Sequence, residues 1–147
     1  MTGPSGDDCA AIVHATCVAL NGRGLLITGA SGSGKSALAL ALMGLGADLV
    51  SDDRVQLARR GGRLLADAPP AIRGLIEARG MGLLVARPAG PTPVVAVVDL
   101  EREETERLPP PRETLLLGVA LPHLRKVGAA HFPPALIQYL RAGRRDT

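Results

Sequence analysis

The stretch that decides the fold is Gly29-Ala30-Ser31-Gly32-Ser33-Gly34-Lys35-Ser36, which fits the pattern G-x-x-x-x-G-K-[ST] at every fixed position. Its glycines let the backbone wrap closely around an anion, with successive N–H groups pointing inward. Lys35 brings a positive charge to the phosphates, and the hydroxyl of Ser36 is suited to hold Mg²⁺. The stretch therefore predicts a P-loop (Walker A motif) at residues 29–36 that binds the phosphates of a nucleotide such as ATP.

The segments on both sides of this loop favour the same interpretation. Leu25-Leu26-Ile27-Thr28 predicts a short strand before it, and residues 37–43 predict a helix after it, whose positive end adds to the attraction for phosphate. Asn21-Gly22 is a dipeptide typical of tight turns. Residues 10–20 therefore predict a strand that includes His14 and forms a hairpin with the strand before the loop.

Composition narrows the classes of function. The chain of 147 residues suits one domain, residues 1–147, and has one Phe, one Tyr and no Trp. This composition excludes the aromatic base-stacking on which single-stranded nucleic-acid binders depend. The net charge is +3, and its one basic cluster, residues 141–145, is interpreted as a solvated tail. No nucleic-acid partner is expected.

Several absences in the sequence favour a cytoplasmic protein. Cys9 and Cys17 lack the spacing of metal ligands, and residues 1–8 lack the basic start and apolar stretch of a secretory signal. No apolar run is long enough to span a bilayer. We expect reduced thiols, a cytoplasmic location and no membrane partner.

The rest of the chain predicts an α/β domain with a mixed sheet. Residues 101–111, a charge run followed by a triple proline, predict an exposed segment. A final helix is predicted at residues 134–142. The further predicted strands are residues 47–51, 54–60, 63–66, 83–85, 94–100 and 115–121.

Asp52-Asp53 is the second informative site, because it follows the strand that comes after the loop helix. At that edge of a sheet, one carboxylate can take a proton from a hydroxyl while the other holds Mg²⁺ or a neighbouring base. Glu77 and Arg79 suit a metal ligand and a contact to a transferring phosphoryl group, respectively. From the residues alone, this second pair fits equally well an exposed acid and base in a loop.

Four segments occur in a fixed order: Val13-His14-Ala15-Thr16, Gly22-Arg23-Gly24-Leu25-Leu26-Ile27-Thr28-Gly29, Leu49-Val50-Ser51-Asp52-Asp53-Arg54-Val55 and Ile76-Glu77-Ala78-Arg79-Gly80-Met81-Gly82-Leu83. Together they resemble the catalytic domain of bacterial HPr kinase/phosphorylase. That family has a His-containing strand, then G-x-G-V-L-I-T-G, an acidic pair, and the signature L-E-I-R-G-L-G-I. The resemblance runs from His14 to Val85, with the signature region at residues 76–85.

The resemblance implies an ATP- and Mg²⁺-dependent kinase that phosphorylates the regulatory serine of the phosphocarrier HPr, and that also reverses this reaction with inorganic phosphate to give pyrophosphate. By motif matching, Asp52 looks like the base, Asp53 and His14 look like its supporting pair, and Ser36 and Glu77 look like the Mg²⁺ ligands. The same matching makes Arg79 a site residue. The implied fold is similar to the nucleotide domain of phosphoenolpyruvate carboxykinase.

The chain also departs from the family pattern. Ala37 and Ala78 replace an acid and an isoleucine, and only Arg125 is left to stand in for the arginine of the C-terminal P-V-x-P-G-R-N segment. There is no room for an N-terminal domain, as in a short form of the family found in alphaproteobacteria. The resemblance implies a hexamer, and the reduced C-terminal part predicts a smaller or looser homo-oligomer with weak phosphorolysis.

Two other functions stay open at this point. A small-molecule P-loop kinase of the shikimate or gluconate type also carries an Asp after the first helix, but it needs an Arg-rich lid. A nucleotide-binding regulatory module without catalysis would explain Ala37 and the reduced C-terminal part, although such a module has little use for His14, Asp52 and Asp53.

Overall fold

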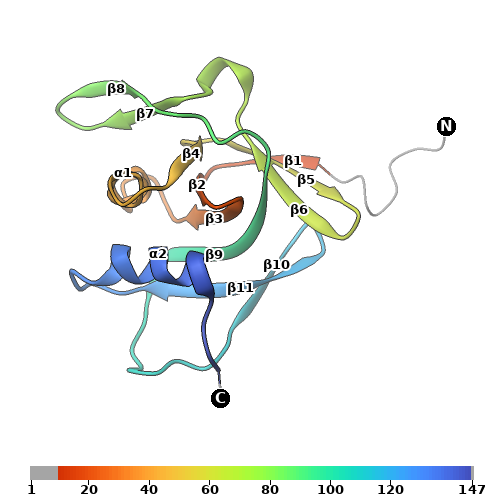
Figure 1. Cartoon of the computed structure of the whole chain (residues 1–147), viewed down its shortest axis with the longest axis vertical. Coiled ribbons are helices and arrows are strands. Elements are labelled where there is room, and N and C mark those ends of the chain that lie inside the picture. The colour runs from red at the N-terminus through yellow and green to blue at the C-terminus, as the bar shows by residue number, and fades with distance from the viewer. Residues whose placement is uncertain (1–9, 147) are drawn as a thin grey trace.

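The computed structural model describes residues 10–146, and Figure 1 shows two helices packed beside a curled sheet. The helices are α1 (Lys35–Gly44) and α2 (Phe132–Ala142), with a short 3-10 turn η1 (Pro70–Ile72). The strands are β1 (Ala10–Val13), β2 (Thr16–Leu20), β3 (Arg23–Thr28), β4 (Asp48–Ser51), β5 (Val55–Arg60), β6 (Arg63–Asp67), β7 (Leu75–Ala78), β8 (Gly82–Val85), β9 (Thr92–Glu103), β10 (Glu113–Leu116) and β11 (Val119–Lys126).

The long strand β9 organises the sheet. Nine of the described strands form one sheet in the order β1-β5-β6-β9-β3-β2-β4, and β11 pairs with both β9 and β10. The start of β9 pairs antiparallel with β6, whereas its later part lies parallel to β3 and β11. Strand β9 therefore connects the β1-β5-β6 part of the sheet to the part that carries the phosphate loop.

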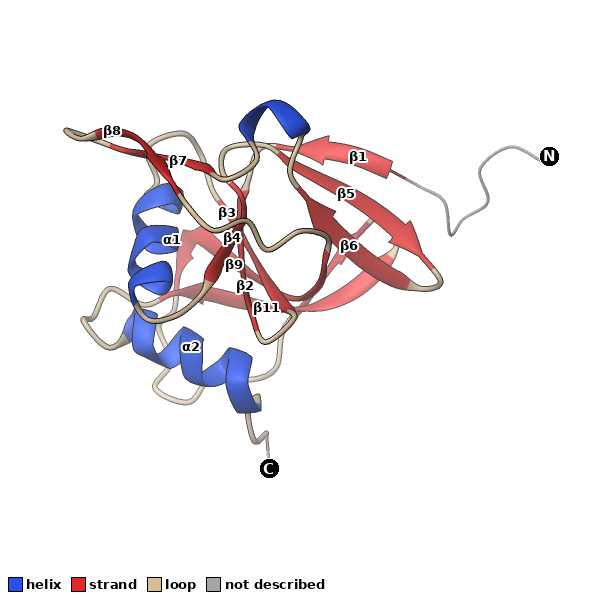
Figure 2. Cartoon of the chain, turned by 45° about the horizontal axis from the view of Figure 1, so that its top comes forward, coloured by secondary structure: helices blue, strands red, loops and turns tan. Residues whose placement is uncertain are grey.

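The two faces of the sheet bury separate cores. Val18 and Leu20 of β2 pack with α1 and α2, whereas Cys17 and Ala19 pack with residues of β5 and β6 inside the curl. This alternation is the period of two expected of a strand buried on both faces. Figure 2 shows α1 and α2 next to each other on the same side of the sheet.

Helix α1 begins at Lys35, two residues earlier than predicted, so Ser36 lies in its first turn. Its alanines and leucines are good helix formers. Ala39 and Leu42 are fully buried against the sheet, and burying a leucine contributes about 1.5–3 kcal/mol. The helix is therefore anchored by packing, and its N-terminus is held at the end of β3.

The predicted hairpin before the phosphate loop is confirmed: β2 pairs with β3 across Asn21 and Gly22, which have φ angles of 53° and 74°. The prediction of one strand over residues 10–20 was wrong. The chain bends at His14 and Ala15, and β1 leaves β2 to pair with β5. His14 therefore lies between two strands, with its side chain half exposed.

The prediction of a single last strand at residues 115–121 was also wrong. Leu117 and Gly118 have φ angles of 48° and 79°, and the chain turns back there between β10 and β11. Two successive residues with positive φ are typical of a tight hairpin turn. The predicted strand at residues 94–100 is confirmed but longer, because β9 continues into the charge run as far as Glu103.

Two observations complete the fold. Strands β7 and β8 form a separate hairpin that lies above α1 in Figure 1. None of the helices in residues 10–146 combines the length and apolarity that crossing a membrane requires. Cys17 is buried, and burial raises the pKa of its thiol to about 12, whereas Cys9 lies outside the described residues.

Candidate active site at the phosphate loop

The phosphate loop joins the end of β3 to the start of α1, as the sequence predicts. Gly29 has φ 150°, and a Cβ there would lie 2.5 Å from Ser33 Oγ and 3.3 Å from the Cβ of Leu100. A side chain at this position would therefore collide with the loop itself. Ser33 Oγ is buried and has no hydrogen-bond partner in the described chain. A buried hydroxyl without a partner is costly, and a phosphate oxygen could supply one.

Lys35 is held inside the loop. The residue is 7% exposed, and its Nζ donates hydrogen bonds to the carbonyl oxygens of Gly29 (2.7 Å) and Ala30 (3.0 Å). A bound phosphate would offer this ammonium a charged acceptor in place of neutral ones, and charge-assisted bonds are roughly twice as strong. The ammonium of Lys35 therefore lies next to the place where phosphates are expected to bind.

Glu101 is a site residue that the sequence reasoning missed, because it placed this residue in a solvated charge run. Its carboxylate Oε1 accepts a hydrogen bond from the backbone N–H of Ala30 at 2.5 Å. The backbone N–H of Glu101 donates to Asp99 Oδ1 at 2.9 Å. The end of β9 thus clamps the first turn of the phosphate loop. The only sequence signal was the place of Glu101 at the end of the most apolar strand.

Asp52 follows β4 directly and is buried, with 7% of its surface exposed. Its Oδ1 accepts hydrogen bonds from the hydroxyls of Thr16 (2.9 Å) and Ser36 (2.6 Å). Its Oδ2 accepts a third, from the backbone N–H of Glu77 at 3.1 Å. These donors come from β2, α1 and β7, so one carboxylate ties three elements together. Thr16 also had no role assigned from sequence, although it lies two residues after His14.

Asp53 has a different environment from Asp52. Its backbone is left-handed, with φ 68°, a conformation that Asp tolerates better than most residues. Its side chain is 61% exposed, and Oδ1 lies 2.6 Å from Nε2 of His14. The same side chain lies only at the edge of contact with Arg54, whose Nε is 4.0 Å from Oδ2. The reversal of the backbone at Asp53 therefore directs the two adjacent carboxylates to different surroundings.

A cavity of about 450 Å³ connects these groups. Its lining includes the loop residues Lys35 and Ser36, together with His14 and Asp53. Glu77 and Arg79 of the β7–β8 hairpin and Ala37 of α1 also line it, whereas Asp52 lies behind this lining. Four of the residues predicted for the site do not line the cavity: the loop residues Gly29, Ala30 and Ser33, and Asp52, whose carboxylate is held by its three hydrogen bonds.

The oxygen donors of the site fit Mg²⁺. This ion favours carboxylate oxygens and usually shares its coordination sphere with water and with the phosphates of the substrate. Ser36 and Asp52 already share a short hydrogen bond, and Glu77 lines the same cavity. Across residues 10–146 no three His, Cys, Asp or Glu side chains gather into a metal site of their own. The donor set therefore suits an ion bound jointly with phosphate.

Arg125 does not join this site. It lines a second cavity, between β11 and α2, with His123 and Arg112. The expectation that it stands in for the family's C-terminal arginine at the phosphates gains no support from this position. Ala37 and Ala78 line the phosphate cavity without replacing the polar groups that the family pattern has there.

A strand, a glycine-rich loop and a helix, with an acidic pair directly after another strand of the same curled mixed sheet, define a P-loop phosphate-binding domain. Comparison with known proteins then narrows this class. Residues 9–91, more than half of the chain, match the family described as HPr Serine kinase C-terminal domain. The chain belongs to this family.

Relatives of known name agree with this assignment. The chain is 46% identical over 72 residues to the HPr kinase/phosphorylase of Mycoplasmopsis pulmonis, and 45% identical over 76 residues to that of Bordetella petrii. These matches cover 49% and 51% of this chain but only 23% and 25% of the two relatives. The chain thus spans about a quarter of the length of the curated relatives it matches.

A solved structure covers more of the molecule. The Hpr(Ser) kinase/phosphatase from Coxiella burnetii superposes with a TM-score of 0.76 and 27% sequence identity. The match covers 89% of this chain and 93% of that one. The prediction of an α/β P-loop domain with a mixed sheet is confirmed.

Proposed function

We propose that this chain is an ATP- and Mg²⁺-dependent serine kinase that phosphorylates the regulatory serine of an HPr-like phosphocarrier protein. The observation that carries the proposal is the His14–Asp53 pair, joined at 2.6 Å, on the wall of the cavity that also holds Lys35 and Ser36. A binding module without catalysis needs the loop but not this pair. The names of the relatives, HPr kinase/phosphorylase and Hpr(Ser) kinase/phosphatase, support the choice of substrate.

The geometry favours Asp53 as the base, which revises the role that motif matching gave to Asp52. Asp53 is exposed in the cavity and can reach an incoming hydroxyl, whereas Asp52 is buried behind its three donors. In the forward reaction the serine oxygen attacks the γ-phosphorus, the serine proton passes to the Asp53 carboxylate, and ADP leaves. His14 holds that carboxylate in place.

The other groups position and stabilise the transferring phosphoryl group. Lys35 exchanges the carbonyl oxygens of the loop for phosphate oxygens, and Arg79 faces the charge that develops during transfer. When bound, Mg²⁺ would supply charge neutralisation on the phosphates, with Ser36 and Glu77 as the side chains that would hold it. Asp52 thus becomes the positioning carboxylate of the pair, through its hydrogen bond to Ser36.

The reverse reaction, attack of inorganic phosphate on phosphoserine to release pyrophosphate, is proposed as a weaker activity. It needs a site for a second dianion, and Arg79 is the only arginine that the described part of the chain contributes to the lining of the cavity. The names of the relatives, which include phosphorylase and phosphatase, support the proposal that the reaction also runs in reverse.

We also propose that the whole chain acts as one catalytic domain in the cytoplasm and associates with itself. Met81, Leu83 and Val85 are 78%, 67% and 88% exposed on the β7–β8 hairpin, which leaves a row of apolar side chains in solvent. Light scattering of the wild type and of Leu83→Asp checks this: a homo-oligomer smaller or looser than a hexamer is expected, and the variant should dissociate further. A tight hexamer, or a variant of unchanged mass, would contradict the proposal.

The decisive experiment is transfer from labelled ATP with Mg²⁺ to HPr-like proteins, each in wild-type form and with its target serine replaced by alanine. Label on the wild-type carrier alone is the expected result. ATP hydrolysis without a labelled carrier, together with transfer to a small metabolite, would favour a small-molecule kinase. ATP binding without any turnover would favour the regulatory module.

A further inference from the structure

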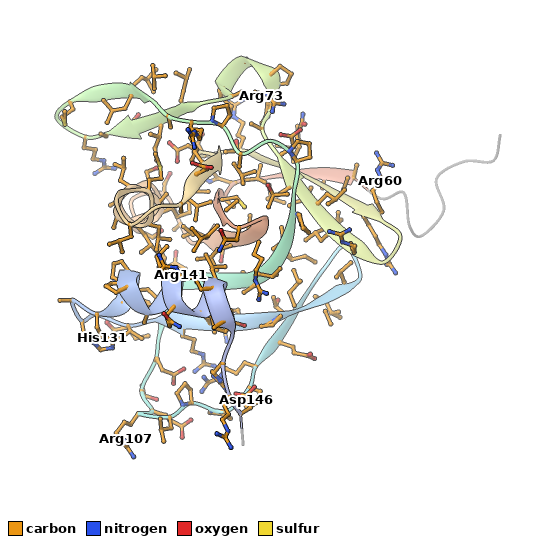
Figure 3. All side chains as sticks on the ribbon, viewed as in Figure 1. Arg60, Arg73, Arg107, His131, Arg141 and Asp146 are labelled. Carbon is orange, nitrogen blue, oxygen red and sulfur yellow. The ribbon has the colours of Figure 1, made fainter. Side chains whose placement is uncertain are left out.

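A second cavity lies outside the phosphate site. It has a volume of about 340 Å³, and we call it the α2 cavity because it lies between α2, β11 and the loop of residues 104–112. Figure 3 shows His131 at the start of α2 and Asp146 beyond its end, whereas Arg107 lies at the tip of the loop, away from α2. The matched family region, residues 9–91, contributes none of the lining residues.

Most of the charges around the α2 cavity are neutralised by partners within the chain. Arg112 contacts Glu104 at 2.5 Å and Glu106 at 3.4 Å. Its side chain is 19% exposed and that of Glu104 is 8% exposed, so the first of these pairs is largely shielded from water. Arg112 therefore has no charge to spare for a ligand.

Two further basic side chains, those of His123 and Arg144, have partners as well. Nε2 of His123 lies 3.4 Å from Oδ2 of Asp99, and Arg144 pairs with Asp146. Each of these side chains therefore has an acid within contact distance. His131 is exposed at the rim of the cavity, where water solvates it.

Arg125 is the exception. It is partly buried on β11 and lines the cavity, and its Nε is shielded from solvent without a hydrogen-bond partner. Within residues 10–146 it has no ion pair either, although Asp99 is its partner in the strand register. A shielded N–H group without an acceptor is unfavourable, and an anionic group brought by a ligand would relieve that cost.

The remaining wall is apolar and holds the only two aromatic residues of the chain, Phe132 and Tyr139. They lie seven residues apart on α2, and Leu124 of β11 and Leu136 of α2 complete this wall. Burial raises the pKa of Tyr139 above its ordinary value, as a wall of low polarity should. A mostly apolar cavity with one convergent charged group is the usual composition of a small-molecule site, and about 300 Å³ is the lower limit of size for such sites.

We propose that the α2 cavity binds a small organic carboxylate, with its aliphatic or aromatic body against Phe132, Leu136 and Tyr139 and its carboxylate against the guanidinium of Arg125. A carboxylate matches the planar fork of an arginine, and one negative charge matches one unpaired cation. A phosphate dianion would need a second free cation, and the described lining offers none that is both shielded and unpaired. This inference does not rest on the proposed kinase activity.

Octanoate is the probe, and the unique aromatics are the reporters. Because the chain has one Phe, one Tyr and no Trp, the ring proton signals of Phe132 and Tyr139 and the tyrosine fluorescence are each assigned without ambiguity. Octanoate should shift these signals saturably and give NOEs from its chain to both rings. Octanamide, which has the same chain without the charge, and inorganic phosphate, which has charge without the chain, should each bind at least about tenfold more weakly.

Two variants separate binding from folding. Arg125→Gln should weaken octanoate binding by about tenfold or more, since it removes the charged partner. Ala135→Leu adds bulk at an exposed lining position of α2 and should weaken the binding of octanoate and of octanamide alike. This variant tests the proposal even if Arg125→Gln does not fold. Arg107→Gln, at the loop tip outside the lining, is the matched control and should leave binding unchanged.

Three outcomes would overturn the proposal. The first is equal affinity for octanoate and octanamide. The second is an unchanged dissociation constant in the folded variants at positions 125 and 135. The third is no saturable shift up to about 10 mM, where even a weak small-molecule site with a millimolar dissociation constant would be largely filled.

Discussion

The phosphate cavity and the α2 cavity differ in whether their polar side chains have partners. In the phosphate cavity, acids and donors hold one another: Asp52 accepts three hydrogen bonds, Asp53 contacts His14, and Lys35 donates to the loop itself. In the α2 cavity the wall is mostly apolar, and Arg125 has no partner in the described chain.

This difference follows the boundary of the region that matches the family. Every residue that we propose for the reaction lies within the matched region, residues 9–91, apart from the clamp at Glu101. The α2 cavity is built entirely from residues beyond that region. Belonging to the family therefore informs us about the first site and leaves the second to be inferred from its own physical chemistry.

The largest expected effect tests the division of work between the two aspartates. Asp53→Asn should lower kcat for phosphoryl transfer by about 10²–10⁴-fold with little change in the affinity for ATP–Mg²⁺, because it removes the proton acceptor. Asp52→Asn should act mainly on that affinity, because its carboxylate positions Ser36. Single-turnover kinetics and equilibrium nucleotide binding separate the two effects.

Asp48→Asn, at the start of β4, is the matched control. Its kcat and its affinity for ATP–Mg²⁺ should stay close to those of the wild type. If Asp52→Asn abolished the chemical step while Asp53→Asn only weakened metal and nucleotide binding, the original assignment from motif matching would stand and our revision would fall.

The next effect concerns the loop lysine. Lys35→Ala should lower transfer by about 10²–10³-fold, the range for the loss of one preorganised donor to a developing charge. The fold should survive, since the hydrogen bonds of Lys35 go to loop carbonyl groups and not to the core. Lys126→Ala, at the only other lysine of the sequence, is the control. If Lys35→Ala transferred phosphate at the wild-type rate at saturating ATP, the assignment of residues 29–36 as the phosphate site would be wrong.

The parts of the fold that could be predicted are those encoded in neighbouring residues. The loop at residues 29–36, the Asn21-Gly22 turn and the acidic pair after β4 each depend on a few adjacent side chains and their backbone preferences. A local pattern determines such features, whatever the rest of the chain does. It also showed where Asp52 and Asp53 lie, but not which of them faces the cavity, because that depends on a φ angle of 68° at Asp53.

The parts that could not be predicted depend on contacts between distant residues. Glu101 and Ala30 are 71 positions apart, and Thr16 and Asp52 are 36 apart. The bend at His14 has no glycine or proline to mark it, and it follows from the pairing of β1 with β5. Hydrophobic patterning did locate β9, but it could not reveal that this strand reaches the phosphate loop.

A smaller effect tests the hydrogen bond that Ala30 of the phosphate loop donates to Glu101 of β9. Glu101→Ala should raise the dissociation constant for ATP a few-fold with little change in kcat, because it removes one exposed hydrogen bond, which contributes about 0.5–1.5 kcal/mol. Glu103→Ala is the matched control, since Glu103 is exposed at the end of β9 and its side chain has no hydrogen bond or ion pair within residues 10–146. A loss confined to kcat would mean that Glu101 takes part in the chemical step and is not a clamp.

The smallest effect should appear in the wall of the α2 cavity, at the Glu104–Arg112 pair. Burial alone would raise the pKa of Glu104, but hydrogen bonds from the backbone N–H of Glu106 and from Arg112 outweigh it, so this pKa lies below its ordinary value. A carboxyl group whose pKa is lowered on folding stabilises the fold at every pH above the unfolded pKa. That stabilisation is lost as pH falls through the lower, folded pKa.

Acidification should therefore loosen the 104–112 loop before it disturbs the phosphate loop. The reporters are two amides that bind this loop to β11, from Glu104 to the carbonyl of Lys126 and from His123 to the carbonyl of Arg112, each 2.8 Å long. Their hydrogen exchange, relative to amides of α1 at the same pH, should rise as Glu104 becomes protonated. Arg112→Gln should raise the pKa of Glu104 toward its ordinary value and shift this rise to higher pH. If Glu104 titrates at its ordinary pKa in the wild type, or if α1 loosens together with the loop, the two cavities do not differ in their response to acid, and the comparison fails on this point.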